Sequence, residues 1–503
     1  MIAAVPALTD FDRGLAAQRS GDVQRAIAAY QRTIASDPRH AAAHFNLGHL
    51  LRAQQDLAGA ALAFEAAAQL RPSAADAWLH LGVSREGLGQ LEPAIAAYRR
   101  AVELGGTLRG TALFNIGNVL RKQGQLVAAG AAFAEAADAA PQAADVWLNL
   151  GNVQRELGRL TDARTSLQRA IQLKPDWAEA SWNLGLVELA DGRLPEGWSG
   201  YAHRWARAGL PGPTALPWAH WQGESLEGKR ILGWGEQGVG DEILFATCVP
   251  DLVDAGASVT LAVDRRLVSL YARSLPDVEV VAHGEWGTEA FDYQAPLGDL
   301  PGRLRASRAA FRPRWSQLVP APAQIAGWTE RLRALSGPLR VGLCWRSGLN
   351  TGERRRYYPT LLDLAPVLRV PGVEFVNLQY DDCRAELESV EAQLGIRIHR
   401  WAGVDLKDDF EAVAALVWHL DLVITAPTAV SSLAGAIGTE TWQLDAGTDW
   451  TLFGEPRSPW LPAIRAFARE YGTNDWGPVC RRIEQELTIR RSREVVASDT
   501  GRA

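Results

Sequence analysis

The sequence predicts a helical solenoid followed by two Rossmann-like α/β lobes, an α plus α/β architecture. Small and aromatic residues recur with a period of about 34 residues in the N-terminal part, which is typical of stacked helix pairs. A short apolar strand runs into a glycine-rich turn near residue 235, and a second alternation of strands and helices, typical of a parallel sheet, begins after Pro338. We therefore expect the repeats at residues 1–209, the two lobes at 217–337 and 338–488, and a disordered tail at 489–503.

The N-terminal repeats have the pattern of tetratricopeptide repeats (TPR). The clearest unit begins at Trp147, carries the pair Leu150-Gly151 and ends at Pro175. Glycine and alanine at fixed positions let two antiparallel helices approach closely, while large residues fill the gap and proline ends the second helix. The same pair recurs, as Leu-Gly or Ile-Gly, with its glycine at Gly48, Gly82, Gly117 and Gly185, and a degenerate first copy carries Gly14.

One position inside the repeats is polar. The residue before each Leu-Gly or Ile-Gly pair is Asn46, His80, Asn115, Asn149 or Asn183. The first helix of each repeat lines the concave groove, and an asparagine amide can both donate to and accept from a peptide backbone. The four asparagines are therefore candidate acceptor-binding residues that form a ladder along the groove. The alternative is that asparagine is common at this position of TPR helices and caps a neighbouring turn.

The composition disfavours several classes of protein. The four cysteines lie far apart without a CxxC pair, which argues against a zinc site or a disulfide framework. A net charge of −6 gives no electrostatic reason to bind nucleic acid or an anionic membrane. No apolar run is long enough to span a bilayer, and residues 1–8 carry no basic residues, so they fail as a signal peptide. We therefore expect a cytoplasmic protein without a metal.

A glycine-rich turn marks the start of the first lobe. Breaker-rich residues 209–217 precede it, and the strand 229–234 leads into Gly235-Glu-Gln-Gly-Val-Gly-Asp-Glu242 and a helical pattern. Bare backbone N–H groups in such a turn can face an anion. The spacing is neither that of a P-loop nor a clean GxGxxG, so generic dinucleotide binding is disfavoured. Further strands are expected at 258–263 and 278–282.

The second lobe is predicted to carry a phosphate-binding helix. Thr428 has the position of a helix N-cap, and Gly438 the position where a helix ends. Ligands of open α/β sheets bind at the carboxyl ends of strands, so the start of this helix would offer N–H groups to a phosphate in a cleft between the lobes. Strands are expected at 339–345, 373–379, 421–425 and 441–444.

Arginines follow the first of these strands. Arg346 and the run Arg354–Arg356 could stabilise a departing phosphate, whereas the alternative for the run is a solvated loop. Asp445, Asp449 and Trp450 follow another strand end, where they could contact a base or ribose or could simply shape the loop.

These motifs together resemble those of a known family. The repeats ending in Gly197-Trp-Ser-Gly-Tyr-Ala-His-Arg-Trp205, the turn Gly235–Asp241 and the later Ala426-Pro-Thr-Ala-Val resemble bacterial TPR proteins with a GT-B glycosyltransferase module. The module is similar to heptosyltransferases, the layout resembles protein O-GlcNAc transferases, and the TPR transferases that glycosylate flagellin in alphaproteobacteria look most similar. The resemblance implies an inverting, metal-independent transfer without a cofactor, with the acceptor on the side of the first lobe and the nucleotide held mainly by the second.

The resemblance also implies residue roles. In heptosyltransferases the aspartate after the glycine-rich turn is the general base, which matches Asp241; Glu242 and Glu236 are alternatives, and Asp241 could instead cap the helix. Pro427-Thr428 and Ser432 stand where heptosyltransferases carry Asp-Thr and a histidine, which leaves the donor open between CMP- and UDP-linked sugars. The candidate donor-binding residues are Gly238, Gly240, Arg346, Ser347, Asn350, Arg354, Arg355, Gln379, Thr428, Ala429, Asp445 and Asp449.

Three functions compete on this basis. The first is transfer of a sugar, such as a nonulosonic acid carried on CMP, to a serine or threonine of a protein recruited by the TPR groove, with flagellin as the acceptor that the resemblance suggests. The second is transfer to an envelope glycan, and the third is an adaptor whose GT-B module is not catalytic. The expected partners are a protein acceptor and a nucleotide sugar, and neither nucleic acid nor membrane.

Overall fold

The computed structural model describes residues 8–206, 212, 216–287, 290–312, 317–335, 337–348 and 352–500. The chain divides into two compact units, of which the first comprises Met1–Leu157 with Thr165–Pro175 and the second Gly158–Arg164 with Asp176–Ala503. The second unit therefore contains the end of the predicted repeat array together with both predicted lobes. Most of the predicted linker 209–217 lies outside the described residues.

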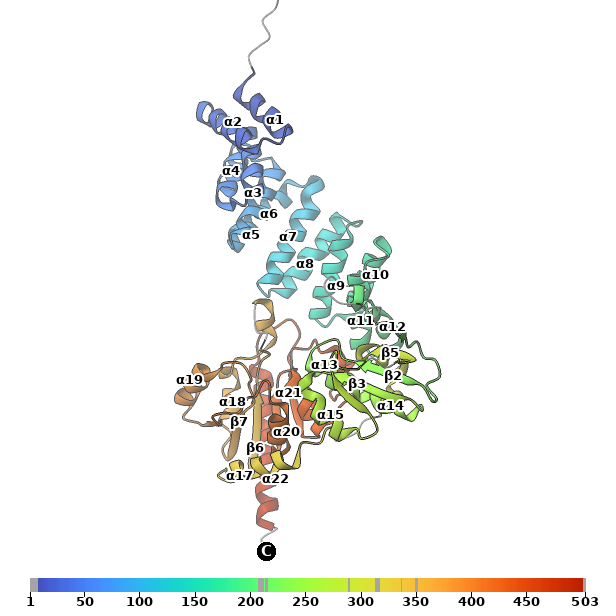
Figure 1. The fold of residues 1–503 in the computed structure, drawn as a ribbon. Coiled ribbons are helices and arrows are strands. Elements are labelled where there is room, and N and C mark those ends of the chain that lie inside the picture. Colours follow the sequence, from blue (N-terminus) through green and yellow to red (C-terminus); the bar gives the residue numbers. More distant parts are fainter. Residues whose placement is uncertain are drawn as a thin grey trace, which may run out of the picture. The chain divides into compact units, whose positions relative to one another are not determined.

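The first unit is a stack of antiparallel helices (Figure 1). Its repeat glycines lie where a side chain has no room: a Cβ at Gly82 would be 2.4 Å from the Tyr98 ring, and one at Gly117 would be 2.6 Å from the Phe133 ring. The predicted close approach of paired helices is thus present. The helices are α1 (Asp10–Arg19), α2 (Val23–Ser36), α3 (Ala41–Ala53), α4 (Leu57–Leu70), α5 (Ala75–Gly87), α6 (Leu91–Leu104), α7 (Arg109–Lys122), α8 (Leu126–Ala139) and α9 (Ala144–Glu156), with α10 (Leu160–Leu173) shared between the units.

Helices α11 (Ala178–Ala190) and α12 (Leu194–Tyr201) belong to the second unit. Their backbones touch, because a Cβ at Gly185 would lie 2.6 Å from the carbonyl carbon of Gly200. Trp198 of α12 packs edge-on against Trp460, with ring centroids 6.0 Å apart, and its indole N–H donates to the carbonyl of Arg305 at 3.0 Å. These contacts fix the short helix η2 (Ala202–Ala206) against the α/β part of the unit.

The first sheet is parallel and has the strand order β1-β5-β2-β3-β4. The strands predicted at 229–234, 258–263 and 278–282 are present as β2, β3 and β4, whereas β5 and the two-residue strand β1 were not predicted. The strands are β1 (Ala219–His220), β2 (Arg230–Trp234), β3 (Ser258–Val263), β4 (Glu279–Ala282) and β5 (Tyr293–Pro296), and the helices between and after them are α13 (Val239–Phe245), α14 (Val249–Asp254), α15 (Val268–Ser274), α16 (Leu300–Leu304) and α17 (Pro322–Leu332).

The second sheet is also parallel, and its order β11-β10-β9-β6-β7-β8 reverses direction between β6 and β9. Ligands of doubly wound sheets bind at such a switch point. Helix α22 continues through residues 489–500, which belong to the segment expected as a disordered tail. The elements are β6 (Leu339–Cys344), α18 (Ala365–Leu368), β7 (Val373–Asn377), α19 (Arg384–Leu394), β8 (Ile398–His399), α20 (Phe410–Trp418), β9 (Leu422–Thr425), α21 (Ala429–Ile437), β10 (Thr441–Asp445), β11 (Ile464–Ala468) and α22 (Gly477–Thr500).

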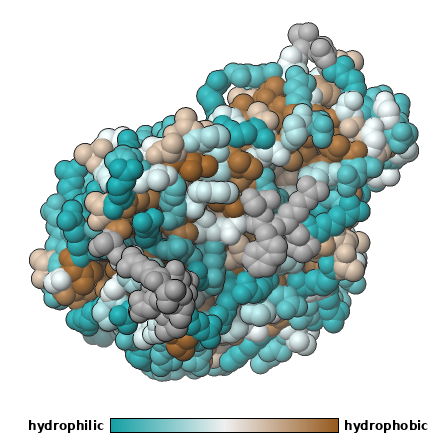
Figure 2. All heavy atoms as spheres, turned by 90° about the horizontal axis from the view of Figure 1, so that it is seen from below, coloured by the Kyte–Doolittle hydropathy of each residue, from teal (hydrophilic) through white to brown (hydrophobic). Residues whose placement is uncertain are grey.

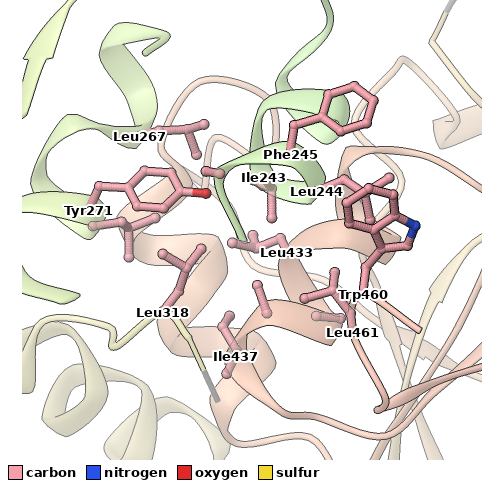
Figure 3. Close-up of a cluster of buried hydrophobic side chains, with 14 of the residues drawn as sticks. Ile243, Leu244, Phe245, Leu267, Tyr271, Leu318, Leu433, Ile437, Trp460 and Leu461 are labelled. Carbon is pink, nitrogen blue, oxygen red and sulfur yellow. The ribbon is translucent and has the colours of Figure 1, made fainter. Parts of the chain in front are cut away.

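One apolar core joins the two sheets through α13 and α21 (Figure 3). Ile243 and Phe245 of α13 lie in the same cluster as Leu433 and Ile437 of α21, and all four side chains are buried. Closely packed apolar side chains of this kind hold two elements in one arrangement. The helix after the glycine-rich turn is therefore fixed against the helix predicted to bind phosphate.

Hydrophobic residues form separate groups among hydrophilic ones on the face seen in Figure 2. Within the part of the chain that the structure describes, no helix has the length and apolar character needed to cross a bilayer.

We expect Gly117→Ala and Gly130→Ala to change stability in opposite directions. A methyl group at Gly117 would meet the buried Phe133 ring at 2.6 Å, and such overpacking costs about 1–3 kcal/mol. A methyl group at Gly130 would have Val153 Cγ1 as its nearest neighbour, at 3.5 Å, which is an ordinary contact. The higher helix propensity of alanine should therefore raise the free energy of unfolding by about 0.5–1 kcal/mol. Urea-unfolding midpoints of the full-length variants measure both effects, and equal midpoints would contradict the close packing at Gly117.

Candidate functional site

A cavity of about 350 Å³ lies where α13 and α21 begin. Residues Gly238–Asp241 line it from the first sheet's side, and Thr428, Ala429 and Ser432 line it from the second. Asp449 and Trp450, which follow β10, also line this cavity. The structure therefore brings the predicted glycine-rich turn and the predicted phosphate helix to one cavity, as expected.

The start of α21 has the features of an anion site. The Thr428 hydroxyl oxygen accepts a hydrogen bond from the N–H of Val430 at 3.3 Å, which confirms the predicted N-cap, and Gly438 ends the helix in a left-handed conformation with φ +93°. The N–H groups of a first helical turn have no partner within the helix, and the positive end of the helix dipole lies there. The Ser432 side chain lines the same cavity one turn further on.

The glycines of the turn serve packing as well as ligand access. A Cβ at Gly240 would lie 3.2 Å from the Cα of Ala429, so Gly240 lets the two helix starts approach each other. A Cβ at Gly235 would lie 2.5 Å from the carboxyl carbon of Glu242, which packs beneath the turn. Gly238 is the N-cap of α13 and lines the cavity.

Asp241 lies at the junction of two cavities. It lines the 350 Å³ cavity and also an adjoining cavity of about 270 Å³, whose other walls include Tyr201, Trp205, Gln237 and Trp450. Burial raises the pKa of Asp241 to about 6, the backbone of Gly238 opposes this shift, and the carboxylates of Glu236 and Asp449 add to it. A carboxylate with a raised pKa between two cavities has the character expected of a general base.

Glu242 does not share this position. Its Oε2 accepts from the N–H of Asp264 at 2.7 Å, its Oε1 lies 2.9 Å from Nε2 of His283, and its side chain is buried. The prediction of Glu242 as a catalytic residue is therefore not supported, because both carboxylate oxygens hold neighbouring strand ends together.

Glu236 lines the smaller cavity but is also engaged in an ion pair. Its carboxylate accepts from Arg204 at 2.8 Å, and Arg204 contacts Asp299 at 2.7 Å, which in turn lies 2.9 Å from His220. Burial raises the pKa of Glu236, whereas Arg204 lowers it. This chain of charges connects η2 to the glycine-rich turn.

The loop after β6 is positioned by Gln379. The side-chain oxygen of Gln379 accepts from the N–H groups of Trp345 and Arg346 at 3.0 and 3.1 Å, and its amide donates to the carbonyl of Arg346 at 3.0 Å. The Arg346 guanidinium donates to Asp381 at 2.9 Å and also to Glu386. These two predicted donor-binding residues therefore shape the loop, while Ser347 lines the 350 Å³ cavity.

The predicted arginine run does not reach the cavity. Arg354 and Arg355 are exposed on the short helix η8 (Gly352–Tyr357), and neither lines the cavity at α21. The solvated loop is therefore the alternative that the structure favours for them. Asn350 lies outside the described residues.

The two predicted aspartates after β10 have different surroundings. Asp449 lines the 350 Å³ cavity and accepts from Gln443 at 2.7 Å and from the hydroxyl of Thr451 at 2.6 Å. Asp445 is buried and absent from the walls of that cavity, and backbone N–H groups that follow it bond to its carboxylate. Burial, and then the neighbouring Asp449, raise the pKa of Asp445. Asp445 thus organises the loop.

The asparagines of the repeats do not all face an open groove. The Asn46 amide donates to the Tyr30 hydroxyl at 3.3 Å, and the Asn149 amide donates to the carbonyl of Asp145 in its own helix at 2.9 Å. Asn115 is half-buried and Asn183 is buried. The amides of Asn46 and Asn149 therefore have partners inside the repeats, as the structural alternative for this position implies.

Several aromatic residues line the two cavities at Asp241. Tyr201 and Trp205 line the smaller cavity, Trp450 lines both, and Tyr380 lines the larger. The motif Gly197–Trp205, which ends the repeat array, is the signal that points to the first two. The strand end before Trp450 made it a candidate to contact a base or ribose, whereas for Tyr380 nothing in the sequence distinguishes a cavity wall from a core position. Among the described residues, no cluster of three or more His, Cys, Asp or Glu side chains has the arrangement of a metal site.

Comparison with known proteins identifies the type of the N-terminal repeats. The family model described as tetratricopeptide repeat matches residues 11–75, 49–109, 81–144, 114–177 and 148–209. Residues 11–209 are tetratricopeptide repeats. The solved structure of MamA protein is 22% identical with a TM-score of 0.32 and covers 34% of this chain and 92% of MamA. YrrB, a TPR protein with an unusual peptide-binding site, is 20% identical with a TM-score of 0.32 and covers 35% of this chain and 91% of YrrB.

A curated relative extends the similarity. Protein FlbA of Caulobacter vibrioides is 39% identical over 311 residues, which correspond to 58% of this chain and 52% of FlbA. The TPR chain thus spans about half the length of this relative.

We expect Asp241→Asn to remove a pH dependence of stability. The ordinary pKa of an aspartate is 3.8 and that of Asp241 in the folded chain is about 6, so the folded state binds this proton more tightly than the unfolded chain does. Stability from this group is therefore present at pH 4 and is lost as the pH rises to about 6. Asp241→Asn should unfold with a free energy higher than that of the wild type by up to about 3 kcal/mol at pH 7.5, and with a similar free energy at pH 4.

Urea titrations at the two pH values measure this difference. The control is Asp277→Asn, since Asp277 is exposed and should leave the pH profile of the wild type unchanged. A gain in stability of the same size at pH 4 and pH 7.5 for Asp241→Asn would contradict the raised pKa.

Proposed function

We propose that this TPR protein transfers a sugar from a nucleotide-sugar donor to a hydroxyl group of a protein that its repeats recruit. The observation that carries the proposal is the position of Asp241, which lines both the 350 Å³ cavity at the start of α21 and the adjoining 270 Å³ cavity. A base at this junction can take a proton from an acceptor in the smaller cavity while a phosphate departs in the larger one.

In the proposed reaction, the acceptor oxygen attacks the anomeric carbon of the donor sugar as the Asp241 carboxylate takes the hydroxyl proton. The bond from the anomeric carbon to the phosphate oxygen breaks, and the nucleotide leaves with that electron pair. Attack from the side opposite the leaving group inverts the anomeric centre. A pKa of about 6 leaves Asp241 ionised at neutral pH while it is more basic than an ordinary aspartate.

Charge on the leaving nucleotide would be stabilised by α21. The N–H groups at Ala429 and the following residues lie at the positive end of the helix dipole, and the Thr428 cap holds the helix start in place. Because these N–H groups are already oriented before the reaction begins, they can stabilise the negative charge of the leaving nucleotide without reorganisation.

The proposed donor is a CMP- or UDP-linked sugar, and the proposed acceptor is flagellin, with a nonulosonic acid as the transferred sugar. The TPR repeats supply a surface of the kind that binds protein segments. Similarity to FlbA, a name that fits a flagellar function, favours a flagellar acceptor over an envelope glycan.

Thermal shifts with CMP, UDP, GDP and ADP test the donor site. A ligand that binds the folded state alone raises its stability by mass action, so we expect one pyrimidine nucleotide to raise Tm. Thr428→Val should lose this increment, because it removes the cap at the start of α21. Thr488→Val removes an exposed hydroxyl bond within α22 and is the matched control that keeps the increment. A flat response across all four nucleotides would favour an adaptor over a transferase.

Measurements of the transfer rate test the proposed role of Asp241 as the general base. With the nucleotide identified and its sugar conjugate as donor, we expect Asp241→Asn to lower the transfer rate by about 100-fold or more, while the nucleotide-induced shift in Tm stays. Glu242→Gln should lower stability without a comparable loss of turnover, because Glu242 bonds to Asp264 and His283 instead of lining a cavity. Full transfer activity in Asp241→Asn would refute the role of Asp241.

A further inference from the structure

Two side chains form the junction between the 350 Å³ cavity at α21 and the adjoining 270 Å³ cavity. Among the residues that the structure describes, Asp241 and Trp450 alone line both cavities. The proposed reaction gives Asp241 the role of the base and leaves Trp450 without one. Trp450 follows β10 and begins the short helix η10 (Trp450–Leu452).

The indole ring of Trp450 is held in place by other aromatic rings. Its centroid lies 5.1 Å from that of Tyr201, 6.1 Å from that of Trp198 and 6.5 Å from that of Phe245. The Asp449 side chain caps η10 and so fixes the backbone at the same point. A ring that is already immobile loses little conformational freedom when a ligand binds to it.

Part of the Trp450 side chain remains accessible. The side chain is half-buried, and its indole N–H bonds to no described residue and is not among the buried polar atoms. The indole N–H groups of its neighbours Trp198 and Trp460, in contrast, each donate to a backbone carbonyl at 3.0 Å. An aromatic ring with an open donor at a cavity wall suits a ligand that combines apolar C–H groups with acceptor oxygens.

The geometry of the proposed reaction determines which part of the donor lies at this junction. In a displacement at the anomeric carbon, this carbon lies between the acceptor oxygen and the departing phosphate oxygen. The proposed function has the phosphate in the 350 Å³ cavity and the acceptor in the 270 Å³ cavity. The sugar ring therefore occupies the junction, where Trp450 is the wall that Asp241 does not form. The ribose and the base, attached to the far side of the phosphate, extend away from it.

The chemistry of a pyranose ring matches an indole wall. One face of such a ring presents C–H groups with a small positive charge, whereas the face of an aromatic ring is negative. Contact between these two faces also removes apolar surface from water. The hydroxyl and acyl oxygens around the sugar ring are acceptors for an N–H donor.

We propose that Trp450 binds the transferred sugar: the C–H face of a pyranose lies against the indole ring, and the indole N–H donates to an oxygen of the sugar. This inference rests on the proposed function, because it takes the positions of phosphate and acceptor from the proposed reaction. It assigns Trp450 to the sugar, whereas the strand end before Trp450 left a base or a ribose as its candidate ligand.

Calorimetric titration of the full-length chain tests the inference. The probes are CMP and UDP, together with the conjugates CMP-N-acetylneuraminic acid and UDP-N-acetylglucosamine, each of which carries a pyranose. The measured quantity is the affinity for the conjugate divided by the affinity for its nucleotide. We expect Trp450→Leu to lower this ratio about 10-fold relative to the wild type, as for the loss of one aromatic contact, and to leave nucleotide affinity unchanged. Comparing ratios between variants cancels the difference in phosphate charge between nucleotide and conjugate.

Trp450→Phe is the milder variant. It keeps an aromatic ring against Tyr201 and loses the indole N–H, so it should lower the ratio about threefold, as for one hydrogen bond. Trp418→Leu is the matched control, because Trp418 is 45% exposed at the end of α20 and lines neither cavity. This control should keep both the ratio and the nucleotide affinity of the wild type.

The possible outcomes separate the inference from the proposed function. If CMP or UDP binds the wild type and both Trp450 variants keep its ratio, the sugar site is overturned and the proposed function stands. An equal loss of affinity for nucleotide and conjugate would assign Trp450 to the base or ribose, or to the support of the loop, and would also overturn the inference. If neither nucleotide binds the wild type, the donor site fails and the inference fails with it.

Discussion

Helix α13 packs against α21 through buried apolar side chains (Figure 3), and Gly240 lets the backbone of Ala429 come close at the point where both helices begin. This contact joins the cores of the two sheets and sets the distance between the glycine-rich turn and the start of α21. Larger side chains at position 240 would separate the helix starts, because the neighbouring atoms belong to a backbone that cannot rotate away. The cavity that carries the proposed chemistry exists because these two helices meet.

The same burial changes the chemistry of the acidic residues in the turn. Glu236 and Glu242 are satisfied by Arg204, Asp264 and His283, whereas Asp241 faces two cavities and has its pKa raised to about 6. Three acidic side chains within seven residues of sequence thus have three different environments. Burial penalises the ionised form and raises the pKa of both Asp241 and Glu236, but Glu236 pairs with Arg204, whereas the backbone of Gly238 opposes the shift at Asp241.

How far the site could be predicted varies from residue to residue. Thr428 and Gly438 were predictable because caps depend on local backbone conformation. Glu242 and Arg346 were misplaced because the partners that occupy them come from strand ends more than twenty residues away. Tyr380 had no signal in the sequence, since the surrounding atoms alone decide whether an aromatic side chain lines a cavity or lies in the core.

The sequence by itself determined the repeat architecture and the central strands, because helix pairs of fixed period and apolar strands of five or six residues are specified by local pattern. Short strands such as β1 and β8 were decided by the tertiary structure, since two residues carry no periodicity and become strands only by pairing with β5 and β7. The tertiary structure also decided which polar side chains face a cavity. Burial and charge pairing depend on contacts between segments distant in sequence, and no local pattern encodes those contacts.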